Sequence, residues 1–442
     1  MPKLYRQKMD EKKLDHQNTL TKEMVYIEDS GSWCANPLYF IYTLENGEKR
    51  CNAGCTDYDM NLYGIESQHA DIFIECNTQS VHGHVILSMR CFKTSVSQVV
   101  FRLNNGLRVK SVHSNSTKLI VEQLDICSNG YRVTLDTPKA EGETINLEMV
   151  YGGQPLLSYP SFIKSERGLL WAETQLLPTL NFFPIDKYKL DLKIYLKPDK
   201  VFVCVGETMT KGEGGHLIHS KIPISGLSFA YGDYRYTNRH SDELEVNLYS
   251  EGLCDAEIHG VFERIFEILK FYLSIFQCLP YSKIHLCYDT RFEICSIHSN
   301  LIYLYRTDDV ALSHELAHLW WGMSVSGNGP GWRWIHEGFA DFFSELYMCH
   351  KDKKMEEKLK WIEKTSFDSL HPFDPINNYD TWFGMEDEMY AIYKERIEAL
   401  VHKAGWKTFI RRIQKVLKEY SFNSITAHML LKKLKEDNDG RL

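Results

Sequence analysis

The sequence predicts a two-domain protein, in which a β-rich N-terminal domain precedes an α+β C-terminal domain. The first observation is size, because 442 residues and 51.6 kDa exceed what one compact core normally holds. The second is a change near Arg239, where apolar residues pass from a spacing of two to the spacing of a helix. We therefore place the domain boundary within about ten residues of Arg239.

The N-terminal half has the pattern of half-buried strands. Residues 1–25 are polar and are expected to form a loose N-terminal arm, and residues 26–238 form the β-rich domain. Asn105 and Gly106 lie between two apolar segments, which is typical of a hairpin with a tight turn. Apolar and charged side chains alternate from Tyr188 to Lys197, which predicts a strand with one wet face. We expect a β-sandwich or a curved stack of sheets.

The C-terminal half, residues 239–442, has helical spacing. An apolar stripe from Ile258 to Phe276 predicts a helix, and Pro280 marks its end. The segment KIHLCY predicts a short strand, and several amphipathic helices follow it. This half is therefore expected to be α+β with helices dominating.

Composition argues against several classes of partner. The net charge is −8 and the pI is near 6.1, so no basic excess drives nucleic-acid binding. No segment supplies the ~18 uncharged apolar residues of a membrane span, and the polar N-terminus has no signal-peptide core. Twelve cysteines are scattered between Cys34 and Cys349 without a ligand pattern. We expect a cytoplasmic protein with no nucleic-acid or membrane partner.

The segment SHELAHLWWG carries the spacing of a metal site. His314 and His318 are four residues apart, so on a helix both imidazoles reach one ion from the same face. Asp308 or Asp309 can cap the start of that helix. Glu315 lies beside the ion rather than on it, where a general base for a zinc-bound water belongs.

A third ligand candidate follows in the segment WRWIHEGFADFFSEL. Eighteen residues separate His318 from Glu337, and Pro330 suits the first turn of a second helix. An antiparallel return would bring Glu337 over the two imidazoles, leaving zinc with two histidines, one carboxylate and an open position. Asp341, one turn further, is a candidate to accept the free N–H of a ligand imidazole, the alternative being a solvated surface acid.

These motifs resemble the aminopeptidase N-like gluzincin family of zinc metallopeptidases. HELAHLWWG, eighteen residues and HEGFADFF are similar to the family's HELAHQWFG and NEGFA. The segment TQLLPTLNFFP resembles the family's TQ and FP landmarks, and the resemblance extends from about residue 140 to the C-terminus. It implies a thermolysin-like zinc catalytic domain in a short form without the family's large C-terminal helical domain.

The resemblance also implies roles for individual residues. His314, His318 and Glu337 would bind one zinc ion per chain, and Glu315 would act as base and proton shuttle. Tyr393 matches the tyrosine of the family's Y-x-K-G segment, which implies a hydrogen bond to the oxyanion.

Three positions near these motifs depart from the family or compete for a role. Tyr390 is a rival for Tyr393, and Arg396 replaces the glycine of the Y-x-K-G segment. His336 stands where the family has Asn, which leaves the local hydrogen bonding open.

The residues that hold a substrate's amino terminus in the family are replaced here. The glutamate of the family's G-x-M-E-N segment aligns with Ile297, and Glu293 could substitute only through a shifted loop. A second amine contact falls on Leu177, while Gln175 is a candidate to line the substrate cleft. An unpaired ammonium in such a pocket is costly.

Three functions therefore stay open for a chain with this site. The first is an aminopeptidase that recruits Glu293 or another acid, acting on short or extended peptides. The second is an endopeptidase or dedicated processing protease that does not recognise the amine. The third is a catalytically idle zinc protein that binds peptides.

Overall fold

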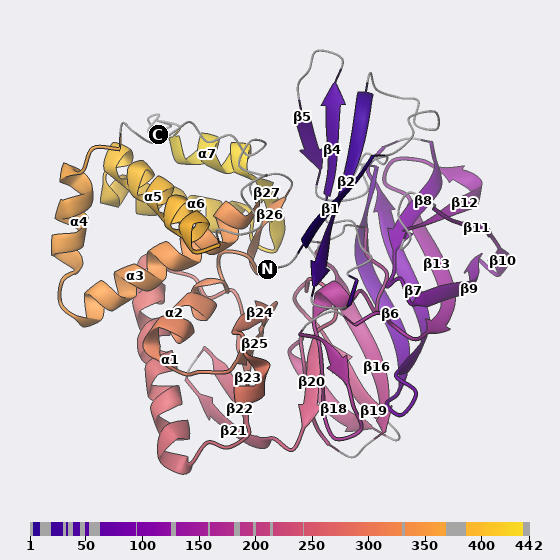
Figure 1. The fold of residues 1–442 in the computed structure, drawn as a ribbon, viewed down its shortest axis with the longest axis horizontal. Coiled ribbons are helices and arrows are strands. Elements are labelled where there is room, and N and C mark those ends of the chain that lie inside the picture. Colours follow the sequence, from indigo (N-terminus) through magenta and orange to yellow (C-terminus); the bar gives the residue numbers. More distant parts are fainter. Residues whose placement is uncertain are drawn as a thin grey trace. The chain divides into compact units, whose positions relative to one another are not determined.

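A computed structural model describes most of the chain in segments. These are residues 3–8, 19–29, 32–33, 39–44, 49–52, 62–93, 95–124, 130–157, 160–180, 186–197, 200–212, 215–241, 243–328, 332–367 and 386–435. Before residue 62 only the backbone is described. The chain divides into two compact units, Met1–Arg235 and Tyr236–Leu442, which are taken one at a time (Figure 1). The domain limits 26–238 and 239–442 stay a prediction.

The first sheet of the N-terminal unit comes from its first 52 residues. It contains β1 (Lys3–Lys8), β2 (Thr19–Asp29), β3 (Ser32–Trp33), β4 (Tyr39–Leu44) and β5 (Lys49–Asn52). The segment expected as a loose arm, residues 1–25, thus contains β1 and the first part of β2, which pair antiparallel. Polar composition does not prevent this pairing, because a ladder is made by backbone groups.

The largest sheet of this unit has eight strands and follows the order β10-β9-β13-β7-β6-β16-β19-β18. Its strands are β6 (Tyr63–Glu75), β7 (Ser80–Cys91), β9 (Leu107–Ser114), β10 (Thr117–Lys118), β13 (Thr144–Gly153), β16 (Lys189–Lys197), β18 (Thr208–Gly212) and β19 (Gly215–His219). The predicted strand at 188–197 is confirmed as β16, which buries Leu190, Leu192 and Ile194. Alternation of side chains thus places one face of β16 in the core.

Two smaller sheets complete the unit. One joins β8 (Val96–Arg102), β11 (Ile120–Gln123) and β12 (Gly130–Lys139). The other joins β14 (Phe162–Ile163), β15 (Gly168–Leu170), β17 (Val201–Cys204) and β20 (Phe229–Gly232), and the 3-10 turn η2 (Ala172–Thr174) follows β15. The β-rich character predicted for this half is therefore observed across several sheets.

The predicted hairpin at Asn105 and Gly106 is wrong. The strands before and after it, β8 and β9, belong to different sheets. The loop is held from outside, because the backbone N–H of Leu156 donates to Asn104 Oδ1 at 2.7 Å. A Cβ on Gly106 would lie 1.8 Å from the carbonyl oxygen of Gln154, so this loop also presses against a distant segment. The chain does turn here, but the turn connects strands of two different sheets instead of two paired strands.

The C-terminal unit is built on a five-stranded sheet with the order β21-β22-β23-β25-β24. Its strands are β21 (Arg235–His240), β22 (Glu245–Ser250), β23 (Lys283–Tyr288), β24 (Ser296–His298) and β25 (Leu301–Leu304), with the 3-10 turn η3 (Thr290–Phe292) before β24. Helix α1 (Asp255–Phe276) joins β22 to the parallel strand β23, and the predicted apolar stripe is buried along it (Figure 1). Both predicted elements, the helix and the KIHLCY strand, are confirmed.

Helices form most of the remaining described part of the C-terminal unit. They are α2 (Asp309–Ala317), the π-helical turn η4 (Trp334–Gly338), α3 (Phe339–Lys351), α4 (Met355–Lys364), α5 (Glu386–Ala404), α6 (Trp406–Glu419) and α7 (Ala427–Lys435). A two-stranded parallel sheet pairs β26 (Val325–Asn328) with β27 (Asn423–Thr426). The predicted fold class, a β-rich domain followed by an α+β domain, is confirmed. Among the described residues, no helix is both long and apolar enough to cross a membrane.

Candidate metal centre

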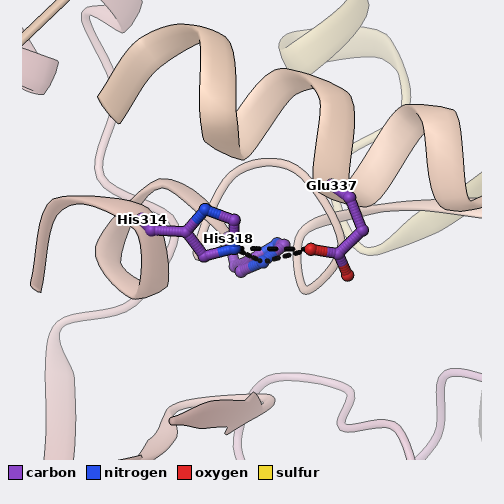
Figure 2. A group of neighbouring side chains, drawn as sticks. All are labelled: His314, His318 and Glu337. Carbon is purple, nitrogen blue, oxygen red and sulfur yellow. Dashed lines mark hydrogen bonds and ion pairs between the residues drawn. The ribbon is translucent and has the colours of Figure 1, made fainter. Parts of the chain in front are cut away.

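Helix α2 places two imidazoles beside each other. Its start is capped by Asp308, whose carboxylate accepts the backbone N–H of Ala311 at 3.0 Å. His314 lies in the last turn, and His318 follows as the residue that ends the helix. Their Nε2 atoms are 3.1 Å apart, as the four-residue spacing predicts (Figure 2). Both rings come from one short helical segment, so the helix itself fixes their spacing.

A second helical segment brings a carboxylate to the imidazoles. Glu337 lies in η4, directly before α3, and its Oε2 is 3.3 Å from His314 Nε2 and 3.4 Å from His318 Nε2 (Figure 2). These ligand atoms all lie within 4.8 Å of one another. Across the described ranges, no other set of three or more histidine, cysteine or acidic side chains brings its ligand atoms this close together. Single π-helical turns are common at functional sites, because they redirect one side chain of a helix.

The outer nitrogens of both imidazoles are engaged by acceptors. His314 Nδ1 lies 2.8 Å from Asp341 Oδ1, and His318 Nδ1 lies 3.0 Å from the carbonyl oxygen of Trp321. Since both partners are acceptors, each Nδ1 carries the hydrogen and donates it outward. With the hydrogen on Nδ1, each ring turns its Nε2 toward Glu337, and in the neutral ring this nitrogen has the lone pair that a metal requires. Asp341 thus takes the position expected of an imidazole acceptor.

The electrostatics of the site favour a bound cation. Burial lowers the pKa of His314, but hydrogen bonds to Asp341 and Glu337 outweigh this effect and raise it well above its ordinary value. Burial likewise raises the pKa of Glu337, yet His318 and His314 hold it well below its ordinary value. Two nitrogens and one carboxylate oxygen form the donor set of catalytic zinc sites that keep a position open. The residues present therefore fit a zinc ion.

Glu315 is buried beside this group without being part of it. Glu315 is only 6% exposed. Burial raises the pKa of Glu315, and the neighbouring His314 and His318 offset only part of that rise. A carboxyl group with a raised pKa can both accept and return a proton near neutral pH.

Tyr393 reaches the same region from α5. It is 4% exposed, and α5 approaches η4 closely, because a Cβ on Gly338 would lie 2.9 Å from Tyr393 Cβ. Gly338 is a residue that the sequence analysis missed, although the glycine of HEGFADFF was visible. The side chain of the rival Tyr390 lies outside the described residues, as does Pro330. Arg396 is partly buried one turn beyond Tyr393.

His336 has a specific partner in place of the family's Asn. Its Nε2 accepts the backbone N–H of Gly327 at 2.9 Å, which links η4 to β26. Since Nε2 is the acceptor, His336 carries its hydrogen on Nδ1 and has no inner lone pair free for the metal group.

The positions implicated in substrate binding are apolar or buried. Ile297 lies on β24 and is 7% exposed, and Leu177 in the N-terminal unit is 1% exposed. Gln175, also in that unit, is buried and its amide donates to Thr179 Oγ1 at 3.3 Å. Glu293 ends the turn η3 with a φ of 61°. The substrate roles of Gln175 and Glu293 stay predictions.

Comparison with curated proteins finds aminopeptidases. The chain is 23% identical over 227 residues to the alanine/arginine aminopeptidase of Saccharomyces cerevisiae, covering 45% of this chain and 26% of that protein. It is 31% identical over 124 residues to endoplasmic reticulum aminopeptidase 1 of Rattus norvegicus, covering 26% of this chain and 13% of that protein. The chain therefore spans about a quarter or less of these relatives' length. No family model matches the chain.

Comparison with solved structures finds the same class over most of the chain. An M1 zinc metallopeptidase from Deinococcus radiodurans superposes with a TM-score of 0.69 at 18% identity, covering 84% of this chain and 90% of that one. A variant of that enzyme bound to a Tyr-Ser-Ala substrate superposes with a TM-score of 0.66 at 17% identity. The resemblance inferred from the motifs is thus confirmed in three dimensions: the chain has the fold of the M1, aminopeptidase N-like zinc metallopeptidases.

Proposed function

We propose that this chain is a zinc-dependent metallopeptidase of the aminopeptidase N-like type, acting on short or extended peptides. The observation that carries this proposal is the convergence of His314 Nε2, His318 Nε2 and Glu337 Oε2 within 4.8 Å. Outward hydrogen bonds from both imidazoles support it, because they leave the inner lone pairs for a metal. The aminopeptidase relatives and the M1 fold support the same reaction class.

His314, His318 and Glu337 would hold one zinc ion per chain. Bound there, zinc would polarise a peptide carbonyl and acidify a water. The remaining steps belong to side chains of this protein, and the candidates are Glu315, which follows His314 in the sequence, and Tyr393, which packs against Gly338 next to Glu337.

Glu315 is assigned the proton transfers of hydrolysis. Its carboxylate takes a proton from the attacking water as the C–O bond forms at the scissile carbonyl. It then gives that proton to the amide nitrogen, so the C–N bond breaks and a neutral amine leaves. Burial and a raised pKa support this assignment, because such a carboxyl group keeps its proton between the two steps.

Tyr393 is assigned the stabilisation of the tetrahedral intermediate. Its phenol O–H would donate a hydrogen bond to the oxyanion that develops on the carbonyl oxygen. The close packing of α5 on η4 at Gly338 supports this assignment, since it holds the tyrosine beside the helix that carries Glu337.

An endopeptidase or processing protease is the second candidate, and specific residues favour it. Ile297 and Leu177 occupy the positions that implied amine anchors in the family, and both are buried and apolar. A cytoplasmic location is proposed with either candidate, because the described cysteines, among them the buried Cys76, Cys204 and Cys287, are free thiols.

The substitution Glu315→Gln tests the catalytic proposal. Cleavage of a diverse peptide pool is measured by mass spectrometry, and metal content by elemental analysis of the same samples. Gln keeps the shape but cannot accept a proton, so turnover should fall at least ~100-fold while one zinc per chain is retained. If wild-type protein with bound zinc cleaves nothing in the pool, the idle peptide-binding alternative is correct.

A further inference from the structure

We propose that Lys394 is a positioning residue, whose ion pair with Glu345 holds the part of α5 that carries Tyr393 against the helix that carries Glu337. The proposal rests on the proposed function, because the position of Tyr393 matters only if its phenol serves the reaction. It adds to that function two residues that touch neither the metal ligands nor the oxyanion.

One carboxylate connects three helices of the C-terminal unit. Glu345 lies on α3 and uses both of its oxygens, with Oε2 2.6 Å from Lys394 Nζ on α5 and Oε1 2.6 Å from Lys358 Nζ on α4. Lys358 also pairs with Glu398 of α5 at 2.7 Å. The two acids and two lysines thus form one continuous series of ion pairs, which connects α5 to α3 directly and also through α4.

The network is shielded enough to be held in place. The side chain of Lys358 is 14% exposed and that of Glu398 is 4% exposed, while Glu345 and Lys394 are about one-third exposed at 31% and 32%. Burial raises the pKa of Glu345, but Lys358 and Lys394 outweigh it and lower the pKa below its ordinary value. The carboxylate therefore stays charged at neutral pH. Ion pairs of this kind are stronger than isolated surface pairs, which contribute little.

The network lies next to the groups assigned to catalysis along both helices. Glu345 is two helical turns after Glu337, since η4 continues directly into α3. Lys394 is the residue that follows Tyr393. Tyr393 itself packs against Gly338 through its Cβ. The helix α5 is thus joined to the η4–α3 helix at the tyrosine and at the residue that follows it.

These two contacts differ in what they fix. The contact at Gly338 is close but apolar, so it sets the distance between the helices without setting how far one slides along the other. The ion pair joins one atom of α5 to one atom of α3, so sliding one helix along the other would separate the two charges, and the pair thereby sets that register. A displacement of about 1 Å in a reacting group can lower the rate about 100-fold, so register is the property that catalysis would require.

The test compares Lys394→Met with a matched lysine elsewhere in the unit. Lys433 pairs with Glu419 at the same 2.6 Å, and its side chain is 30% exposed. Turnover is measured on the peptide that wild-type protein cleaves fastest, together with KM and zinc content. Lys394→Met should lower kcat about 10- to 100-fold with KM and zinc unchanged. Lys394→Arg should restore most of the rate, and Lys433→Met should leave kcat unchanged.

A double variant shows whether Lys394 acts through Tyr393. In a Tyr393→Phe background, Lys394→Met should have little further effect, since the group that it positions is already gone. Two reductions that multiply would overturn the proposal, as would normal kcat in Lys394→Met. If Lys394→Met does not fold, Glu345→Gln takes its place with the same expectations. Normal kcat in Tyr393→Phe, with Glu315→Gln inactive, would remove the role of Tyr393 and the inference with it, leaving the metallopeptidase proposal standing.

Discussion

At the scale of single residues, the imidazoles of the metal centre are oriented by two unlike acceptors. His314 faces the carboxylate of Asp341, whereas His318 faces a backbone carbonyl, that of Trp321. A carboxylate contributes charge as well as orientation, so it raises the basicity of its imidazole more than a carbonyl does. The carbonyl cannot be removed by substitution, and the carboxylate can. Asp341 is therefore the position at which the outer hydrogen bonds are open to experiment.

We expect Asp341→Asn to weaken zinc binding about 10- to 100-fold, the usual effect of losing an outer carboxylate. The amide oxygen can still accept the imidazole N–H, so the ring keeps its tautomer but loses the neighbouring charge. Zinc affinity is measured by competition with a chromophoric chelator. Asp352→Asn, at the end of the same helix, is the control and should bind zinc as wild type does. Equal affinity in both variants would mean that the charge of Asp341 does not contribute to zinc binding.

At the scale of elements, the site is made by helices that meet at one glycine. The backbone of Gly338 is helical, with φ −62° and ψ −42°, so any residue could adopt its conformation. The absence of a side chain is needed for space, because a Cβ there would lie 2.9 Å from Tyr393 Cβ and 3.3 Å from its carbonyl carbon. The close approach of α5 to η4 therefore depends on this one residue.

We expect Gly338→Ala to destabilise the protein by about 1–3 kcal/mol, because the added methyl group forces α5 away from η4. The displacement also moves Tyr393, so kcat should fall while zinc remains bound. Denaturant unfolding and steady-state kinetics measure the two effects. Gly260→Ala is the matched control on α1, where the new Cβ meets only the flexible end of Arg264 at 3.4 Å. There alanine should be neutral or add about 0.5–1 kcal/mol of stability. Similar behaviour of both variants would argue against the packing role of Gly338.

At the scale of the whole molecule, the positions that align with the family's amine contacts are distributed over both units of the chain. The family's amine contacts align with Ile297 in the C-terminal unit and with Leu177 in the N-terminal unit. Each is an apolar, buried residue, so neither can pair with a substrate ammonium. We therefore propose that catalysis in this chain does not require recognition of the substrate's amine, since the residues assigned to catalysis are present.

We expect N-acetylated peptides to be cleaved within about threefold of the rate of their free counterparts, because neither Ile297 nor Leu177 can form a hydrogen bond or ion pair with a free ammonium. Mass spectrometry of products from paired free and blocked pools measures this directly. Products cut away from the N-terminus would identify an endopeptidase. Complete protection by acetylation would instead show that Glu293 or another acid supplies the anchor.

Much of the fold and the ligand set could be predicted because their patterns are local. The alternation along β16, the stripe along α1 and the four-residue spacing of His314 and His318 all arise from backbone geometry. The hairpin at Asn105 and Gly106 failed because a local turn pattern does not say which sheet each flanking strand joins.

The sequence by itself determined the two-part architecture and the pairing of His314 with His318, since helix and strand periodicities are properties of short segments, and its motif offered Glu337 as the third ligand. Only the tertiary structure decided that Trp321 and Gly327 supply backbone partners to His318 and His336, and that Gly338 and Glu345 hold α5 in place. The physical reason is that such contacts join residues through packing and hydrogen bonds that no spacing along the chain encodes.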